Sequence, residues 1–143
     1  MTIKQLIKLE DKASEVWVVS PALHWDTENQ AFSELVSVNL GEKTKYRYIV
    51  PATRQIEKNL RVYKKLYNVS DQEVAKNFLF LPESDFNPFI PESAIYDASS
   101  DCIACSAPGM VDGTDVIRYD EATSKKMAAS FKKVWKKYKR TNP

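Results

Sequence analysis

The sequence predicts a single α/β domain over residues 1–143: a mixed, mainly parallel sheet with helices on both faces. Three short β-branched or aromatic runs, 15–20, 45–50 and 78–81, alternate with segments whose apolar residues recur at helical spacing. This alternation is typical of parallel strands joined by crossover helices. A chain of 143 residues with 43% hydrophobic content is long enough to bury one core.

Capping signals mark the helices in the first half of the chain. A capping box at Thr2 to Gln5 predicts a helix over 2–13, and a second box beginning at Thr27 predicts a helix that ends at Gly41. Helical spacing of apolar residues continues over about 53–67, and Ser70 caps a further short helix.

The pattern changes after a loop over 83–91. Two short runs, 93–96 and 102–105, are separated by a five-residue polar turn, which favours a β-hairpin. Another short strand is expected near 116–119. A long basic amphipathic helix then follows over 120–139, with its apolar stripe facing inward.

Composition and charge narrow the classes of protein. Only three glycines are present, which argues against a glycine-rich phosphate loop, and no apolar run is long enough to span a membrane. The charged N-terminus does not resemble a secretory signal, so a cytoplasmic location is expected. The net charge of +2 is uneven, because residues 125–140 hold eight basic side chains and no acidic one.

Five polar residues follow the ends of the three predicted parallel strands. Because such strand ends meet at one edge of a sheet, these residues are expected to line a mixed-charge ligand crevice. They are His24, Asp26, Arg54, Glu83 and Asp85. His24, the only histidine, could instead act with Asp26 as a general base, which is the alternative of a small enzyme. A further interpretation is that His24 is a loop side chain without a functional role, either exposed or packed on Trp25.

The two cysteines form a C-x-x-C motif at Cys102 and Cys105. On a strand, residues three apart point to opposite faces, so the thiols should diverge as buried structural side chains. Zinc would need further ligands that a chain with one histidine does not supply in a recognisable pattern. We therefore predict no metal and no cofactor.

The C-terminal helix offers a candidate surface for nucleic acid. Its outward lysines include Lys132, Lys133, Lys136 and Lys137, and positive charge of this kind contacts phosphates. The aromatic residues of the helix fall on its inward stripe, which does not favour base stacking. A solubilising outer face is the alternative interpretation.

The segment from Ile95-Tyr96-Asp97 through Cys105-Ser106-Ala107-Pro108-Gly109 is similar to the phospholipase D superfamily. Half-domains of that family carry His-x-Lys-x(4)-Asp before a hairpin and a Gly-Ser-x-Asn type segment after it. If Asp97 matches the motif's Asp, then Ile90 stands at the His position and Glu92 at the Lys position. The later segment keeps its Ser but lacks the Asn.

The resemblance implies a catalytically silent half-domain. An isoleucine cannot be the nucleophile, and a glutamate would repel the phosphate that the family's lysine holds. Active members pair two halves, so the resemblance also implies a homodimer. Asp97 is then expected to be structural, at the turn of the hairpin. The leading hypothesis is a non-catalytic binding or regulatory domain. Its expected partners are a second copy of the chain and an unknown protein or small ligand, and no membrane partner is expected.

Overall fold

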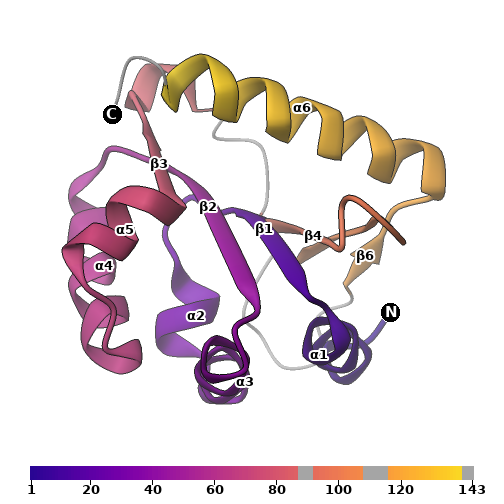
Figure 1. Ribbon diagram of the computed structural model, residues 1–143, viewed down its shortest axis with the longest axis horizontal. Coiled ribbons are helices and arrows are strands. Elements are labelled where there is room, and N and C mark those ends of the chain that lie inside the picture. The colour runs from indigo at the N-terminus through magenta and orange to yellow at the C-terminus, as the bar shows by residue number, and fades with distance from the viewer. Residues whose placement is uncertain (87–91, 108–115, 140–143) are drawn as a thin grey trace.

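A computed structural model describes residues 1–86, 92–107 and 116–139, apart from the side chains of His24 and Trp25. Helices and strands alternate along most of the chain (Figure 1). In order, the elements are α1 (Ile3–Lys12), β1 (Glu15–Val19), α2 (His24–Glu28), α3 (Gln30–Gly41), β2 (Lys45–Pro51), α4 (Arg54–Tyr67), α5 (Asp71–Asn77), β3 (Phe78–Leu81), the short 3-10 helix η1 (Glu83–Asp85), β4 (Glu92–Tyr96), β5 (Ile103–Ala107), β6 (Ile117–Arg118) and α6 (Glu121–Lys139). None of these described helices has the length and apolar character needed to cross a membrane.

The described strands form one mixed sheet in the order β3-β2-β1-β4-β5-β6. The α/β class is confirmed, but the prediction of a mainly parallel sheet is wrong. β1 pairs in parallel with β2 and β2 with β3, whereas the β1–β4, β4–β5 and β5–β6 pairs are antiparallel. The reason is the hairpin of β4 and β5, which places β4 antiparallel beside β1 at the centre of the sheet.

Local capping explains the helix boundaries, with one correction to the sequence prediction. Thr2 forms the predicted capping box of α1. The predicted box at Thr27 does not form, because α2 already occupies that stretch and the Thr27 hydroxyl donates to the carbonyl of Leu23 at 2.6 Å. Asn29 caps α3 instead, since its side chain accepts from the Phe32 N–H at 3.1 Å.

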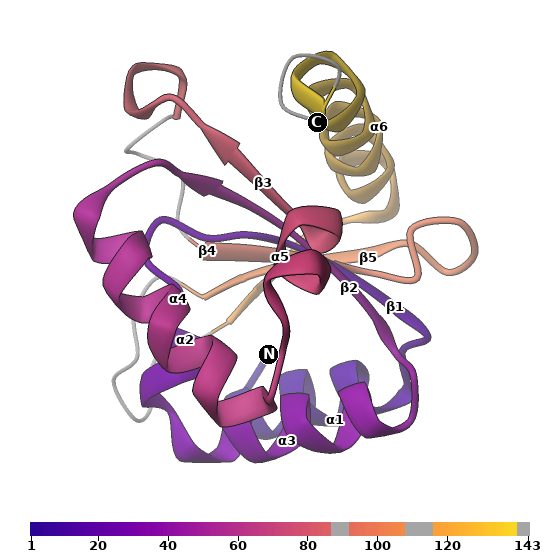
Figure 2. The same ribbon diagram turned by 60° about the vertical axis from the view of Figure 1, so that its left-hand side comes forward.

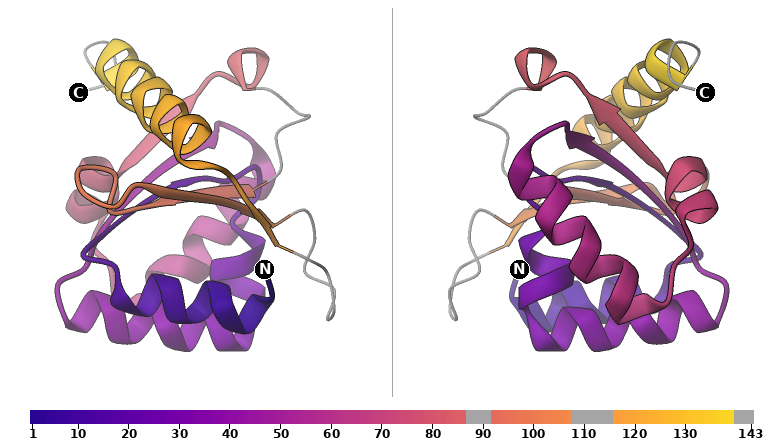
Figure 3. Two further views of the ribbon diagram at one scale, coloured as in Figure 1. Left: turned by 90° about the vertical axis from the view of Figure 1, so that its right-hand side faces the viewer. Right: turned by 90° about the vertical axis from the view of Figure 1, so that its left-hand side faces the viewer.

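The domain has three layers, which Figure 2 and Figure 3 show from different sides. Helices α1 to α4 lie on one side of the sheet, and α6 lies on the other together with the short η1. We name the first side the tyrosine face, because Tyr46, Tyr48 and Tyr96 belong to its core. We name the second the α6 face, whose core includes Trp17 and Phe131.

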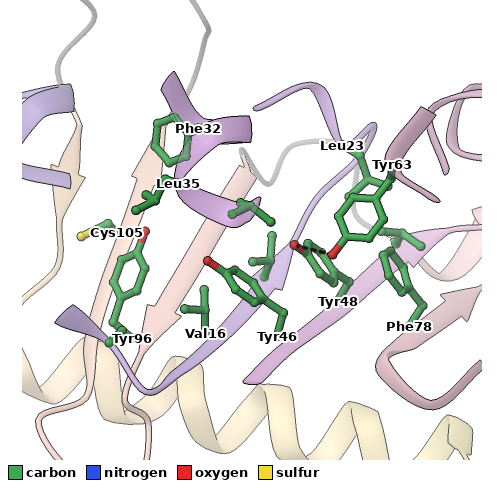
Figure 4. Packing of buried hydrophobic residues seen from close by; sticks show 14 of the residues in the cluster. Val16, Leu23, Phe32, Leu35, Tyr46, Tyr48, Tyr63, Phe78, Tyr96 and Cys105 are labelled. Carbon is green, nitrogen blue, oxygen red and sulfur yellow. Dashed lines mark hydrogen bonds between the residues drawn. The ribbon is translucent and has the colours of Figure 1, made fainter. Parts of the chain in front are cut away.

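The tyrosine face is packed with aromatic rings (Figure 4). Tyr48 stacks on Phe78 with ring centroids 4.5 Å apart and meets the edge of Tyr63 at 5.5 Å. Alternation along the strands produces this arrangement, because every second residue of β2 faces α1 to α4. Tyr46 and Tyr48 therefore share a face, and Ile49 lies on the opposite one.

A column of aromatic rings joins α6 to the sheet. Trp17 from β1 stacks on Phe131 at 4.8 Å, and Phe131 stacks on Trp135 at 5.8 Å. Phe131 and Trp135 are four residues apart and so lie on one side of the helix. The predicted inward stripe of the C-terminal helix is confirmed at these positions.

Asp97, in the turn between β4 and β5, has the structural role predicted for it. Its Oδ1 accepts hydrogen bonds from the backbone N–H groups of Ser14 at 2.9 Å and Glu15 at 3.1 Å, which fixes the start of β1. The two cysteines are free and buried, as predicted, and belong to the cores of opposite faces: Cys105 to the tyrosine face and Cys102 to the α6 face.

Candidate ligand-binding site

A cavity of about 360 Å³ lies between the sheet and α6. We name it the α6 cavity. Its floor is formed by apolar side chains at the carboxyl ends of the parallel strands: Val19, Ile49 and Leu81. Ile95 of β4 adjoins them. The cavity thus lies where open α/β sheets bind ligands.

The helix supplies the opposite wall of the α6 cavity. Met127, Phe131 and Val134 line it and follow the i, i+4, i+7 spacing of one helical face. Phe86, which follows η1, adds a further apolar wall. The described lining is therefore mostly hydrocarbon and aromatic surface, which suits an apolar ligand body.

Polar groups gather at the mouth of the α6 cavity, where Lys126, Ser130 and Asp85 are exposed. The carboxylate of Asp85 accepts a hydrogen bond from the Tyr138 hydroxyl at 3.0 Å. Lys126 forms no ion pair with any acidic side chain in the described part of the chain. Its ammonium group is therefore available to an anionic ligand group at the mouth.

The tyrosine face holds a second, much smaller cavity of about 30 Å³. Three carboxylic residues from three elements border it: Glu10 of α1, Asp26 of α2 and Glu92 of β4. We name these three the carboxyl cluster. A space of that size holds about one water molecule, so it cannot admit an organic substrate.

Hydroxyl groups satisfy the carboxyl cluster. Glu10 accepts from Tyr96 at 3.0 Å and from Tyr46 at 3.1 Å through its two oxygens. Asp26 accepts from the Tyr48 hydroxyl at 2.6 Å, and the hydroxyl of Ser20 donates to Glu92. Each helix or strand that carries a carboxyl group is thereby fastened to a neighbouring element.

Burial is the main influence on the protonation of the carboxyl cluster. It raises the pKa of Glu10 to about 8, with a further rise from the charge of Asp26, while the bonds from Tyr96 and Tyr46 oppose the shift. Burial and Asp26 likewise raise the pKa of Glu92 to about 8. The pKa of Asp26 rises to about 6 by burial, against the bond from Tyr48.

The carboxyl cluster has the residue types of an acid–base or metal site, but its side chains are not accessible to a substrate. Among residues 1–86, 92–107 and 116–139, no group of three or more His, Cys, Asp and Glu side chains has a geometry that could hold a metal ion. The carboxyl oxygens instead accept bonds from interior hydroxyls. The arrangement holds the packed layers together by hydrogen bonds.

Of the five residues predicted to share a crevice, the four whose side chains the structure describes are not brought together. Asp26 is buried on the tyrosine face, whereas Asp85 lies at the mouth of the α6 cavity. Arg54 and Glu83 are exposed at the first residues of α4 and η1, and neither lines the α6 cavity. His24 begins α2, but its side chain lies outside the described residues. Of the five, Asp85 alone among the described side chains lines the cavity.

The predicted lysine surface is exposed on α6. Lys132, Lys133, Lys136 and Lys137 all lie on the solvent side of the helix. Of the residues matched to the family motif, Ile90 lies outside the described residues and Glu92 belongs to the carboxyl cluster. Ser106 is buried, with its hydroxyl 2.7 Å from that of Ser93 and 2.9 Å from that of Tyr119.

Sequence reasoning missed Glu10 and Glu92 as neighbours of Asp26 in the carboxyl cluster, and it missed the wall of the α6 cavity. A signal for Glu10 was present, since it lies four residues after Leu6 and therefore on the buried stripe of α1. No comparable signal marked the cavity, because Met127 and Val134 read as ordinary core residues of an amphipathic helix.

A scan against protein-family models and searches of curated proteins and of solved structures gave no match to this chain.

Proposed function

We propose that this chain is a non-catalytic binding domain whose ligand is a small amphipathic carboxylate, held in the α6 cavity. The observation that carries the proposal is the cavity itself, of about 360 Å³, at the carboxyl ends of β1, β2 and β3. Ligand pockets in proteins have volumes of about 300–1,000 Å³ and mostly apolar walls with few polar groups. The α6 cavity falls at the lower end of that range.

The class of ligand follows from the charges at the mouth. Lys126 and Asp85 are the charged side chains among the described lining residues, and Asp85 already accepts a bond from Tyr138. The ammonium group of Lys126 is thus the group left to receive a ligand oxygen. A carboxylate head with an apolar tail or ring places its charge at Lys126 and its body against Ile49 and Ile95.

Calorimetric titration with decanoate tests this proposal, with decan-1-ol as a ligand of the same tail without the charge. We expect both to bind the native chain. Lys126→Gln should weaken decanoate about tenfold, because it removes one charge-assisted contact, and should leave decanol within about twofold. Ser130→Trp should abolish the binding of both by blocking the mouth of the cavity.

Ala129→Trp is the matched control, since Ala129 is the exposed neighbour of Ser130 and does not line the cavity. Binding should survive in that variant. The proposal is wrong if neither ligand binds, if decanol binds and decanoate does not, or if Ser130→Trp and Ala129→Trp behave alike.

The absence of phospholipase D-type catalysis is part of the same proposal. Its support is that the residues at matching positions are engaged in folding contacts: Glu92 with Ser20, and Asp97 with the backbone at the start of β1. Descent from a silent half of that superfamily, and a cytoplasmic location, remain predictions.

The homodimer is also a proposal, and it rests on the paired halves of the family that the chain resembles. Sedimentation at micromolar concentration separates a dimer from the monomer of 16.4 kDa. A monomer would contradict the dimer without bearing on the ligand.

A further inference from the structure

The outer side of α6 carries lysines that form no ion pair with acidic side chains among the residues that the structure describes. Lys132, Lys133, Lys136 and Lys137 are exposed, and none forms an ion pair with an acidic side chain in the described ranges. The ion pair that α6 does form, Lys125 with Glu121 at 2.8 Å, lies in its first turns. The last two turns are therefore predominantly basic, and the acidic Asp85 reaches them through the hydrogen bond that it accepts from Tyr138 at 3.0 Å.

Strand β2 extends this charge beyond the helix. The Arg47 guanidinium lies 5.4 Å from the ring centroid of Trp135, and the Lys139 ammonium lies 5.2 Å from the same ring. Trp135 therefore contacts two cations from different elements. Burial lowers the pKa of Lys139, and the neighbouring positive charge of Arg47 lowers it further.

Lys132 connects the rest of the surface to the aromatic column, because its ammonium lies 5.8 Å from the ring centroid of Trp17. We name the surface formed by Arg47, Lys132, Lys133, Lys136, Lys137 and Lys139 the basic surface. These six side chains are all basic, and the aromatic rings beneath several of them hold the cations near the sheet. The Lys139 ammonium already donates to the backbone carbonyls of Ala75 at 2.6 Å and Phe78 at 3.0 Å, so Lys139 adds charge to the surface while the other five supply the donors.

We infer that the basic surface binds the phosphate backbone of nucleic acid. The stretch from Lys132 to Lys139 is about 10 Å long at the helical rise of about 1.5 Å per residue. A nucleic-acid strand carries one charge per about 3.4 Å of axis, so this stretch faces about three phosphates. Exposed lysines without acidic partners contact phosphates at little cost in broken ion pairs.

The surface has no means of reading bases. Trp135 stacks on Phe131 and contacts Arg47 and Lys139, so its ring faces are occupied within the protein. Backbone contacts position a protein on nucleic acid but carry no sequence information. Binding is therefore independent of sequence and sensitive to salt.

An anionic membrane is the other polyanion to weigh, and the side chains of α6 disfavour it. Peripheral helices bind membranes by burying an apolar face. The apolar residues of α6, including Phe131, pack on the sheet instead. The large hydrophobic side chains that the described chain exposes are Val38, Val62, Leu66 and Ile117, and none belongs to α6.

Fluorescence anisotropy with labelled duplexes of two unrelated sequences tests this inference. Both duplexes should bind equally at about 50 mM salt, and affinity should fall about 40-fold on raising the salt to about 200 mM, as about three phosphate contacts require. The double variant Lys132→Glu with Lys136→Glu should lose at least tenfold in affinity. Lys133→Glu with Lys137→Glu provides an independent second variant.

The matched control is Lys4→Glu with Lys8→Glu, which reverses two exposed lysines at the same i, i+4 spacing on α1 and changes the net charge equally. It should lose less than about threefold. The inference is overturned if no duplex binds, if control and test variants lose affinity equally, or if the chain binds vesicles of anionic lipid but not the duplexes.

Discussion

The cavity that borders the sheet on the tyrosine face, beneath helices α1 to α4, is about 30 Å³, whereas the one between the sheet and α6 is about 360 Å³. A further hollow of about 290 Å³ lies among α3, α4 and α5, and no strand residue lines it. The tyrosine face contains three carboxylic residues, each bonded to hydroxyl groups of the interior. The α6 face has an apolar cavity with charged groups at its mouth. The polar residues that look most reactive therefore stabilise the fold, and the larger of the two cavities that border the sheet lies on its other side.

The largest expected difference between the two faces is in how stability depends on pH. Glu10, on the tyrosine face, should make the free energy of unfolding fall as the pH rises. An unfolded chain ionises this group near 4.5, but the folded chain keeps it protonated up to about 8. Its contribution to stability is complete below pH 4.5, declines as the pH rises, and is lost above about 8. The loss amounts to about 5 kcal/mol at most.

Urea unfolding at a series of pH values measures this loss. Glu10→Gln cannot ionise, so its free energy of unfolding should decline several kcal/mol less than that of the native chain between about pH 5 and 9. Glu57→Gln, at an exposed position in the first turn of α4, should follow the native curve. Parallel curves for the native chain and Glu10→Gln would show that Glu10 is not held protonated.

A smaller effect on the free energy of unfolding is expected from removing either of two tyrosine hydroxyls, each of which donates to an aspartate. The loss should differ between the two faces. Tyr48 is fully buried, donates to Asp26 and lies 3.3 Å from the hydroxyl of Tyr63. Tyr48→Phe leaves buried groups without a partner and should cost about 1–3 kcal/mol. Tyr138→Phe removes a bond to the exposed Asp85 and should cost less than about 0.5 kcal/mol.

Chemical denaturation midpoints at unchanged slope measure both of these losses. Equal losses for the two variants would contradict the distinction between a buried hydrogen bond on the tyrosine face and a solvent-facing one beside the α6 cavity.

Much of the fold could be predicted from local patterns. Alternation along β1 separates Val16 and Val18 from Trp17, and these residues do lie in different cores. Caps and apolar stripes predicted the ends of α1 and α6 to within a few residues. Strand neighbours are not encoded locally, however, so nothing in the sequence indicated that the hairpin would bring β4 antiparallel beside β1.

The candidate site was harder to predict for a related reason. The strand-end argument placed Asp26 and Asp85 at one edge, but it could not decide on which side of the sheet each loop turns. Asp26 is carried by α2 beneath the tyrosine face, and Asp85 follows β3 onto the α6 face. A cavity also forms where side chains from elements distant in the sequence leave a space unfilled. The spacing of apolar residues along the chain does not indicate where this happens.

The central claim is that the α6 face, and not the tyrosine face, receives the ligand. Methyl-resolved NMR during a decanoate titration tests it most directly. We predict shifts at methyl groups that line the α6 cavity, including those of Val19, Ile49, Leu81, Ile95, Met127 and Val134, with Val16, Val18 and Leu35 unmoved. Shifts confined to the tyrosine face, or no shifts at saturating decanoate, would contradict the account.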